Sequence, residues 1–497
     1  MADAASVRSA SAALSTTTAR HTAVVRATHW ISTLCFFALL LSGVEIVISH
    51  PRFYWGEEGN VLTPLLFTLP IPASRSSVVT GYEFVLPDQN GWSRYLHFQA
   101  AWIAVLTGLL YIASSLFKRH FRNHLLPARS DLTWGTISRV FVNHLRFRRP
   151  SEAEAWSYNV LQRLAYLFVV FVLFPLMIWT GLAMSPAIAS AFPLTVTVLG
   201  GQQSARTIHF FGSLSLVLFL LVHILMVCRA GFGNRTRTMI TGRVDTQRGG
   251  VASSNFSRRK VITQGLAAAA GLSGLVEAAR VADRHGLIPP DHGGIYGFGE
   301  TLTYASQRLL TRHALAREFP RNRISKTPFA NGKLPEGEEF ERLRAGGFAD
   351  WRLVVDGMVA RPASFSLAEL RTYPSGSQIT HLACEEGWSF IAEWIGAPLF
   401  HILNAVRILP HAAYVVYFSI QRDWWDSIDM ADAFHPQTFV TYGMNGGELS
   451  VAHGGPLRLR VPRQLGYKSV KYINRLTITD SLKKFSPEGS YAWYAGI

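Results

Sequence analysis

The sequence is poor in cysteine. Its 497 residues include only three, Cys35, Cys228 and Cys384. Three thiols cannot form a disulfide framework, an iron–sulfur cluster or a paired CxxC zinc site. A CxxCH segment is also missing, so the chain carries no signal for covalent attachment of c-type haem. These classes of structural and redox site are therefore excluded.

Long apolar runs are confined to the first half of the chain, while the half after Asp283 reads as globular protein. Four runs approach the length that spans a bilayer: residues 29–49, 97–117, 161–184 and 208–228. Pro175 should kink the third run, which neighbouring helices can accommodate. The sequence thus predicts a four-helix transmembrane bundle in contact with lipid, followed by a separate soluble domain.

Charge is missing from one loop and concentrated in another. Residues 185–204 carry no charged side chain, whereas the loop of residues 118–150 is heavily basic, as are both flanks of the bundle. Basic loops stay in the cytoplasm, so both ends of the bundle and its middle loop should lie there. The net charge of +16 is then a topology signal rather than a sign of nucleic-acid binding. We expect a protein of a bacterial inner membrane.

Histidines in the apolar runs form two levels. His29 opens the first run at the cytoplasmic end, and His97 opens the second at the opposite end. The fourth run carries His209 and His223, and fourteen residues of helix bring two side chains to within roughly 40° of one face, about 21 Å apart. Depth therefore pairs His97 with His209 and His29 with His223. Such pairs suit two b-type haems, although any one histidine alone would be read as an interfacial hydrogen-bonding group.

This segment order and histidine placement resemble the di-haem cytochrome b subunits of formate dehydrogenases and nickel–iron hydrogenases. The resemblance implies electron exchange between a quinone and a partner protein across the membrane. His120, His124 and His144 lie in the basic loop and are interpreted as surface residues.

A twin-arginine-like segment follows the bundle. Residues 257–262 read SRRKVI and precede a weakly apolar stretch. They resemble the signal with which bacteria export proteins that are already folded. An interfacial amphipathic helix is the alternative. The segment is either cleaved or kept as a fifth helix, and the domain after it would lie in the periplasm.

The last two hundred or so residues alternate short apolar runs with Gly, Pro and Asn. Strands are expected at 351–359, 378–383, 412–420, 456–462 and 471–479, and a short helix near Ser366. The fold class is therefore multi-domain, an all-α bundle plus an α+β, mostly β, domain. The expected boundaries are a disordered N-terminus (1–20), a di-haem cytochrome b domain (21–232), a linker (233–285) and an oxidoreductase domain (286–497).

Cys384 directly follows an apolar strand in the sequence HLACEEGWSF. A lone buried cysteine is most often a small hydrophobic residue. This stretch, however, resembles the molybdenum-binding segment of the sulfite oxidase and periplasmic methionine sulfoxide reductase family. A soft thiolate suits molybdenum, which also takes two sulfurs from molybdopterin. The Cys384, Glu386, Trp388 pattern resembles the reductase branch.

A second segment, MNGGELSVAHGGPLRLRVPRQLGYKSVKY, resembles the pterin-binding segment of the same family, with features closer to sulfite oxidase. Its turns present backbone N–H groups while Arg458, Arg463, Lys468 and Lys471 supply positive charge, an arrangement suited to a phosphate. A solvated strand edge is the alternative for any one of them. The resemblance implies pterin contacts from a group of five residues: His453, Arg458, Ser469, Lys471 and, less directly, Ser419.

Three functions remain open from the sequence. The leading hypothesis is a membrane oxidoreductase that carries electrons from the quinone pool through two b haems to molybdenum, where it reduces a small periplasmic S- or N-oxide. Trp424, Trp425 and Asp426 would shape the substrate pocket or simply pack. The second hypothesis reverses the flow, so that sulfite or another donor is oxidised. The third is a cytochrome b electron carrier whose exported domain binds a partner without a cofactor.

Overall fold

The computed structural model describes residues 22–71, 89–119, 121–145, 160–229, 231–242, 277–289, 298–422 and 424–485. By their internal contacts the residues fall into two compact units. Unit 1 comprises Met1–Cys35, Ile103–Leu173 and Leu214–Leu266, and unit 2 comprises Phe36–Trp102, Phe174–Ser213 and Ala267–Ile497. The twin-arginine segment and residues 1–20 lie outside the described residues, so both predictions remain untested.

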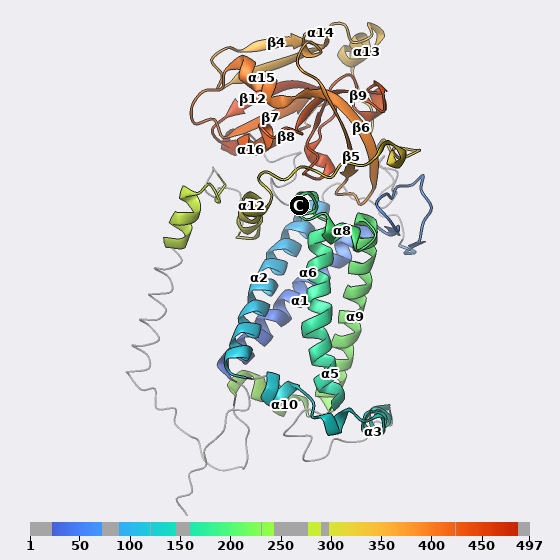
Figure 1. Ribbon diagram of the computed structural model, residues 1–497, viewed down its shortest axis with the longest axis vertical. Coiled ribbons are helices and arrows are strands. Elements are labelled where there is room, and N and C mark those ends of the chain that lie inside the picture. Colours follow the sequence, from blue (N-terminus) through green and yellow to red (C-terminus); the bar gives the residue numbers. More distant parts are fainter. Residues whose placement is uncertain are drawn as a thin grey trace, which may run out of the picture. The chain divides into compact units, whose positions relative to one another are not determined.

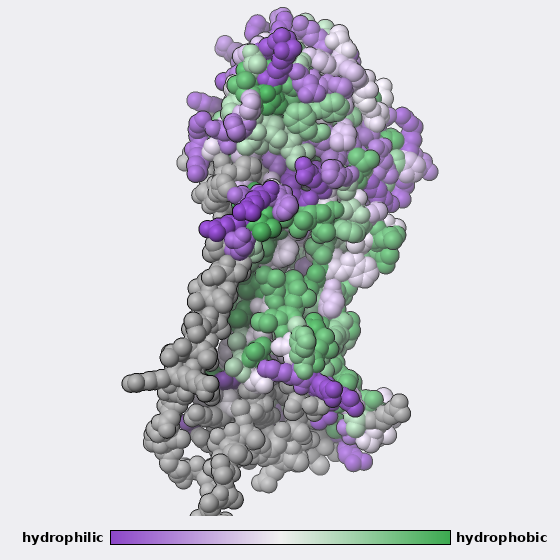
Figure 2. All heavy atoms as spheres, turned by 60° about the vertical axis from the view of Figure 1, so that its left-hand side comes forward, coloured by the Kyte–Doolittle hydropathy of each residue, from purple (hydrophilic) through white to green (hydrophobic). Residues whose placement is uncertain are grey.

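Four helical spans are long and apolar enough to cross a membrane: Ala23–Ile48, Trp92–Phe117, Val160–Ala183 and Gln202–Arg229. They belong to α1 (Ala23–Ser49), α2 (Gln89–Phe117), α5 with α6 (Val160–Phe168 and Phe174–Ala183) and α9 (Gln202–Arg229), all traced in Figure 1. Apolar side chains cover these helices in Figure 2, whereas polar ones gather on the β-rich domain. The predicted transmembrane bundle is confirmed.

The third span changes its helical geometry just before Pro175. Val169–Leu173 forms a π-helical turn, η3, between α5 and α6. Proline lacks an N–H and its ring collides with the carbonyl four residues earlier, and a wider π-turn relieves that collision. The irregularity predicted at Pro175 is therefore present as a π-bulge.

Short helices fill the connections of the bundle. The loop between the second and third spans contains η1 (Phe121–Leu125), η2 (Arg129–Leu132) and α3 (Trp134–Leu145). The uncharged loop contains α7 (Pro186–Ala191) and α8 (Leu194–Thr197), and Ser185 caps α7 by accepting a bond from the Ile188 N–H. Helix α10 (Phe232–Thr241) follows α9 and is bounded by Gly231 and Gly242, both with positive φ.

The second half forms two five-stranded sheets. One has the order β10-β9-β6-β5 with β11 also paired to β9, and the other has the order β4-β3-β12-β7-β8. Figure 1 labels several strands of both sheets. The first sheet contains β5 (Gly376–Ala383), β6 (Ser389–Pro398), β9 (Phe439–Met444), β10 (Gly447–Glu448) and β11 (Arg458–Arg460). The second contains β3 (Arg352–Gly357), β4 (Ala363–Ser366), β7 (Tyr414–Ser419), β8 (Trp425–Asp429) and β12 (Ile473–Thr479).

Four of the five runs predicted as strands contain one of these strands, the fifth lies within β5, which begins two residues earlier at Gly376, and the mostly β fold class is confirmed. The helix expected near Ser366 is α14 (Leu367–Leu370), where Ser366 and Glu369 form a capping box. Other helices of this half are α12 (Phe298–Leu310), α13 (Glu338–Ala345), α15 (Leu399–Val406) and α16 (Met430–Ala433).

The main core joins the two sheets. Leu353 of β3, Tyr417 of β7 and Leu476 of β12 lie in one buried cluster with Val440 of β9 and Leu459 of β11. Strand β6 is buried on nearly every residue. Because β5 and β6 lie in this rigid framework, the turn between them, which begins with Cys384, is held in a fixed place.

The short loop after α1 packs on the same framework. Gly59 forms a β-bridge with Ser389 at the start of β6, and the Arg317 guanidinium lies 2.6 Å from Glu57. All of these residues belong to unit 2.

Candidate cofactor sites

In unit 2, His97 of α2 faces His209 of α9. Their ring centroids are 6.3 Å apart and the ring planes differ by 55°. If both rings bound one metal ion through Nε2 at about 2.0–2.1 Å, as imidazoles bind metals, the centroids would be separated by roughly 6.3 Å. The observed spacing therefore fits an iron held between the two rings.

Hydroxyl groups fix the tautomer of both rings. Ser42 Oγ donates to the Ala38 carbonyl and lies 3.0 Å from His97 Nδ1, so the oxygen accepts from an Nδ1–H. Thr180 Oγ1 likewise donates to the Leu176 carbonyl and lies 2.8 Å from His209 Nδ1. With the proton on Nδ1, each Nε2 keeps a lone pair for a metal, the usual arrangement of a ligating histidine.

A glycine follows each of these hydroxyl residues. A Cβ at Gly43 would lie 3.9 Å from His97 Cε1, and a Cβ at Gly181 would lie 3.7 Å from His209 Cε1. A branched side chain at either position would extend towards the ring edge. The two Ser/Thr–Gly pairs thus serve the two histidines in the same way, which the sequence interpretation did not anticipate.

In unit 1, His29 of α1 faces His223 of α9 with ring centroids 6.5 Å apart. Phe219 stacks on His223 at 5.8 Å and Tyr166 lies edge-on to it at 6.1 Å. Among the described residues no hydroxyl bonds the His29 Nδ1, which is buried. The structure therefore forms both predicted pairs, but only the pair in unit 2 has a hydrogen-bonded tautomer.

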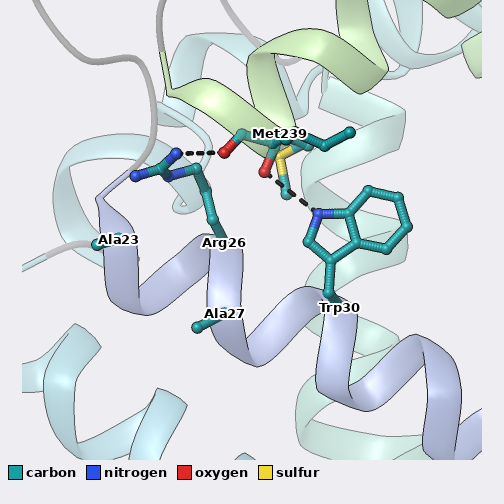
Figure 3. Close-up of a pocket in the computed structure, with 6 residues that line it drawn as sticks. Ala23, Arg26, Ala27, Trp30 and Met239 are labelled. Carbon is teal, nitrogen blue, oxygen red and sulfur yellow. Dashed lines mark hydrogen bonds between the residues drawn. The ribbon is translucent and has the colours of Figure 1, made fainter. Parts of the chain in front are cut away.

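A pocket opens between α1 and α10 in unit 1 (Figure 3). It has a volume of about 480 Å³ and is lined by Ala23, Arg26, Ala27 and Trp30 of α1 and by Met239 and Ile240 of α10. Trp30 Nε1 donates to the Met239 carbonyl, and the Arg26 guanidinium donates to the Ile240 carbonyl at 2.5 Å. The ring of Trp30 lies 5.3 Å from that of His29.

In the β-rich domain, Cys384 begins the turn between β5 and β6. Its N–H donates to the Trp388 carbonyl, and the turn then closes through Gly387. Cys384 is buried, and its Sγ lies 3.2 Å from Glu385 Oε2 and 3.8 Å from Glu386 Oε2. Burial, together with the two carboxyl groups, raises the pKa of this thiol well above its usual value.

Glu386 is held in the same turn. Trp388 Nε1 donates to Glu386 Oε2 at 2.8 Å, and Asn331 Nδ2 donates to it at 3.2 Å. Burial and the neighbouring Glu385 raise the pKa of Glu386 to about 7. The three predicted residues Cys384, Glu386 and Trp388 are therefore brought together by one turn.

Three basic groups near this turn, of which Arg458 and Arg460 are buried and Lys471 is half-buried, form no ion pair with a carboxylate among the described residues. Arg458 donates to the carbonyls of Ser469 and His453, and Lys471 donates to those of Asn331 and Ala452. The two residues form a β-bridge, and both interact electrostatically with Cys384. Burial lowers the pKa of Arg458 to about 10 and, with Arg458 nearby, that of Lys471 to about 7.

The third group, Arg460, was missed in the sequence interpretation. It is completely buried, donates to the His381 carbonyl at 2.7 Å and to Thr380 Oγ1 at 3.2 Å, and has an unpaired buried Nε. Arg458 and Arg460 both lie over the Trp394 ring, at 5.2 and 5.3 Å. Their two-residue spacing on β11 places them on one face, and that alternation was the signal that could have identified Arg460.

Ser469 and His453 complete the cluster. Ser469 Oγ accepts from the Val461 N–H at 3.1 Å, and its carbonyl accepts from Arg458. His453 Nδ1 lies 2.8 Å from Ser450 Oγ. Burial, with Arg458 and Lys471 nearby, lowers the pKa of His453 to about 4, so this imidazole is neutral.

Other residues assigned to the site from sequence lie in different surroundings. Arg463 pairs with Asp432, and Lys468 pairs with Asp426 at 2.5 Å, so neither cation is available to a phosphate. Ser419 ends β7 in the other sheet and accepts from the Gln421 N–H. Trp425 packs against Phe418 and Phe485. Sequence spacing could not distinguish Arg463 and Lys468 from Arg458, because their carboxylate partners belong to elements that are distant in the sequence.

The cluster around Cys384 fits molybdopterin on chemical grounds. It offers one soft sulfur for the metal and, beside it, the buried guanidinium groups of Arg458 and Arg460, which form no ion pair with a carboxylate among the described residues. Burying such cations is unfavourable unless an anion pairs with them. A phosphate monoester of the pterin would meet that requirement.

Comparison with known proteins gives two family matches. Residues 20–242 match the model for prokaryotic cytochrome b561, and residues 343–485 match the oxidoreductase molybdopterin-binding domain.

A curated relative, the putative protein-methionine-sulfoxide reductase subunit YedZ1 of Azospira oryzae, is 36% identical over 189 residues, which are 38% of this chain and 70% of the relative. Among solved structures, the sulfane dehydrogenase SoxCD of Paracoccus pantotrophus is 22% identical with a TM-score of 0.28. That match covers 34% of this chain and spans about half, 46%, of the SoxCD chain.

Proposed function

The chain belongs to the prokaryotic cytochrome b561 family and carries an oxidoreductase molybdopterin-binding domain, and from this premise we propose that it transfers electrons from a membrane quinol to a periplasmic S- or N-oxide. It is a membrane molybdopterin oxidoreductase with a b-type cytochrome. The proposed direction and substrate class rest on the Cys384 turn, in which a near-neutral carboxyl lies beside the metal-binding thiol. The name of the curated relative is consistent with a sulfoxide substrate.

Molybdenum bound at Cys384 would supply a two-electron centre that accepts an oxygen atom. The chain's own contribution is the thiolate ligand, because a metal displaces the proton that burial otherwise keeps on the sulfur. Arg458, Arg460, Ser469 and Lys471 would hold the phosphate end of the pterin. These residues already point their donors into one buried cluster, so little reorganisation is needed on binding.

Glu386 is suited to supply a proton. The overall reaction breaks the S–O bond of a sulfoxide or the N–O bond of an N-oxide, consumes two electrons and two protons, and releases the oxygen as water. A carboxyl group with a pKa of about 7 is protonated in a substantial fraction of molecules at neutral pH, and such a group is an efficient general acid. Trp388 and Asn331 fix its position through the hydrogen bonds described above.

The two histidine pairs would hold one b haem each. His97 and His209 form the better prepared site because Ser42 and Thr180 fix their tautomers. Fourteen residues of the continuous helix α9 separate His209 from His223, which is roughly 21 Å of helix. Two haems on one helix would therefore carry electrons across the bilayer.

The pocket between α1 and α10 is the proposed quinol site. Its volume of about 480 Å³ lies in the range of small-molecule pockets. Apolar groups of Trp30, Ala27 and Ile240 suit a quinone ring, and Arg26 provides a polar contact for a ring oxygen (Figure 3). A quinol oxidised there would release two protons and pass its two electrons, one at a time, towards the His29–His223 pair.

The localisation follows from the same assignment. The basic flanks and middle loop would lie in the cytoplasm, and the β-rich domain in the periplasm of a bacterial inner membrane. The segment of residues 257–262 would direct export of that domain after its cofactor has been inserted.

The decisive test uses purified protein with a short-chain quinol and methionine sulfoxide, dimethyl sulfoxide or trimethylamine N-oxide. We expect quinol oxidation that depends on one of these acceptors and two haems and one molybdenum per polypeptide. Cys384→Ser should lose molybdenum and at least ~100-fold of the activity while keeping its haem.

The matched control is Cys228→Ser, which changes the exposed thiol near the end of α9 and should leave both measures unaltered. If sulfite reduces the quinone instead, and no oxide reoxidises the haem, the proposed direction is wrong.

A further inference from the structure

Two arginines occupy equivalent places before the histidines of unit 2. Arg94 precedes His97 by three residues on α2, and Arg206 precedes His209 by three residues on α9. Residues three apart lie on neighbouring parts of one helix face, about one turn from each other. Each arginine is therefore one helical turn from a proposed haem ligand.

Both arginines reach the turn that begins with Cys384. Arg94 Nη2 donates to the backbone carbonyl of Glu385, and Arg206 Nη1 donates to that of Gly387 at 3.2 Å. The loop after α1 joins the same contact: Arg94 lies 3.1 Å from His50 Nε2, and Arg206 donates to the His50 carbonyl at 2.6 Å. All of these residues belong to unit 2.

A third side chain of α9 strengthens the contact. Gln203 Nε2 donates to the Gly387 carbonyl at 3.0 Å and to Ser389 Oγ at 2.8 Å. The carbonyl of Gly387 thus receives donors from two residues of one helix. The bond from Arg206 is charge-assisted and therefore stronger than the neutral bond from Gln203.

Gly387 allows the close approach. Its φ is +86°, and a Cβ there would lie 3.1 Å from His50 Cγ and 3.2 Å from Arg206 Nη1. Any other residue would be strained and would also press on the contact.

From these contacts we propose that Arg94 and Arg206 are positioning residues that fix the Cys384 turn against the helices of His97 and His209. The turn is then the route for electrons between the haem and the molybdenum site. One connection runs from Cys384 through the backbone to the Glu385 carbonyl, across its hydrogen bond to Arg94, and then along one turn of α2 to His97. Each crossing takes one electron from a ferrous haem and leaves it ferric. Two crossings and two protons reduce one S- or N-oxide to its parent compound and water. This inference rests on the proposed function.

The test separates electron delivery from chemistry at the oxide. Reduced methyl viologen, a small soluble donor, can supply electrons directly to an exposed molybdenum domain, whereas a quinol must use the haems. In Arg94→Ala and Arg206→Ala we expect quinol-driven oxide reduction to fall roughly 10- to 100-fold, the loss typical of about 1 Å of misplacement. Viologen-driven reduction and the contents of haem and molybdenum should remain within about 2-fold of those of the unaltered protein, and Arg94→Lys should recover part of the quinol-driven rate.

Two further readouts do not depend on steady-state activity. Haem absorbance after rapid mixing of reduced protein with the oxide should return to the ferric form more slowly in both alanine variants. Amide hydrogen exchange of residues 384–389 in the full-length protein should become faster, because the turn loses its donors.

Arg317→Ala is the matched control. Arg317 also joins the loop after α1 to the β-rich domain, through Glu57 at 2.6 Å, but it does not contact the Cys384 turn. This variant should behave like the unaltered protein in every measurement. An equal effect of Arg317→Ala would show that general docking, not the turn, controls the rate.

Three other results would overturn the inference: equal loss with both donors, no loss with the quinol, or unchanged hydrogen exchange at residues 384–389. If the unaltered protein reduces no oxide even with viologen, the proposed function fails instead. The positioning role would then be tested by the rate at which sulfite reduces the haem, which the same substitutions should slow, and by the hydrogen exchange.

Discussion

The β-rich domain buries two sets of basic residues that differ in their counter-charges. The compensated set, Arg308, Arg463 and Lys468, pairs with Asp429, Asp432 and Asp426. The uncompensated set, Arg458, Arg460 and Lys471, bonds mainly backbone carbonyls and hydroxyl groups among the described residues. Arg458 and Arg460 are as deeply buried as the compensated set, whereas Lys471 is half-buried, so burial alone does not distinguish structural cations from functional ones.

The clearest electrostatic difference is at Asp432, because burial still raises the pKa of Asp426 and Asp429 despite their cations. Although burial alone would raise it, the guanidinium groups of Arg463 and Arg308 hold the pKa of Asp432 at about 2. In the uncompensated set, burial lowers the pKa of Arg458 and Lys471 and, with Arg458 nearby, lowers that of Arg460 well below its usual value. The first set is complete within the folded chain. The second would be stabilised by an anion that the described residues do not provide, which is the property of a binding site.

The largest expected effect comes from breaking a compensated pair. Lys468→Met leaves Asp426 buried without its cation, and removing one partner of a buried pair typically costs about 3–5 kcal/mol. We expect the free energy of unfolding of the β-rich domain to fall by this amount in cofactor-free protein. Pulse proteolysis in urea measures it.

The double variant Lys468→Met/Asp426→Leu is the control, because it removes both charges. It should regain most of the lost stability. If the double variant is as unstable as the single one, the ion pair is not the source of the effect, and the distinction between the two sets loses its basis there.

Sequence reasoning located the ingredients of this site but not their grouping. Cys384, Glu386, Arg458 and Lys471 were identified because each stands in a short motif, and the turn from β5 to β6 and the β-bridge between Arg458 and Lys471 bring them together. Arg463 and Lys468 belong to the same motif, yet their carboxylates come from β8 and α16. Such long-range pairing is set by tertiary contacts, which one sequence does not reveal.

The next effect is expected in the uncompensated set. Arg460→Met removes a buried cation without leaving a carboxylate unpaired, so cofactor-free protein should lose much less stability than Lys468→Met does. Cofactor retention should instead weaken about 10- to 100-fold, because hydrogen bonds to a charged group contribute about 1.5–3 kcal/mol. Molybdenum per polypeptide after extended dialysis measures the loss.

Arg463→Met is the comparison for cofactor retention. It should destabilise the domain as Lys468→Met does, but folded molecules should keep their cofactor. If Arg460→Met unfolds the cofactor-free domain as readily as Lys468→Met, Arg460 is a structural residue and the uncompensated set is smaller than proposed.

In the membrane half, the sequence predicted the four spans and both histidine pairs, because apolar length and helical phase are local properties. Ser42 and Thr180 were missed. A hydroxyl in an apolar helix usually bonds its own backbone, as both also do here. Their second bond, to a histidine on another helix, depends on helix packing, which periodicity does not specify.

The smallest effect concerns pH. Protonation of His435 would add to the compensated region a positive charge that has no counter-charge of its own. His435 lies beside Arg463, Asp432 and Arg308, and burial, followed by the charge of Arg463, lowers its pKa to about 4. Its Nε2 lies 3.2 Å from the Ala314 carbonyl, and its Nδ1 accepts from the Gln437 N–H, so the neutral ring satisfies both neighbours.

Since the folded-state pKa of His435 is depressed, the unfolded chain binds this proton more tightly. The stability that the neutral ring contributes is therefore fully present above about pH 6.5 and is lost as the pH falls towards 4. We expect the free energy of unfolding to fall by on the order of 2 kcal/mol across this window. In His435→Asn, whose amide oxygen can still accept from Gln437 but does not titrate, the slope should be shallower. If the free energy of unfolding changes equally with pH in the two proteins, the compensated set tolerates an added positive charge. Counter-charges would then matter less to this fold than the difference between the compensated and uncompensated sets implies.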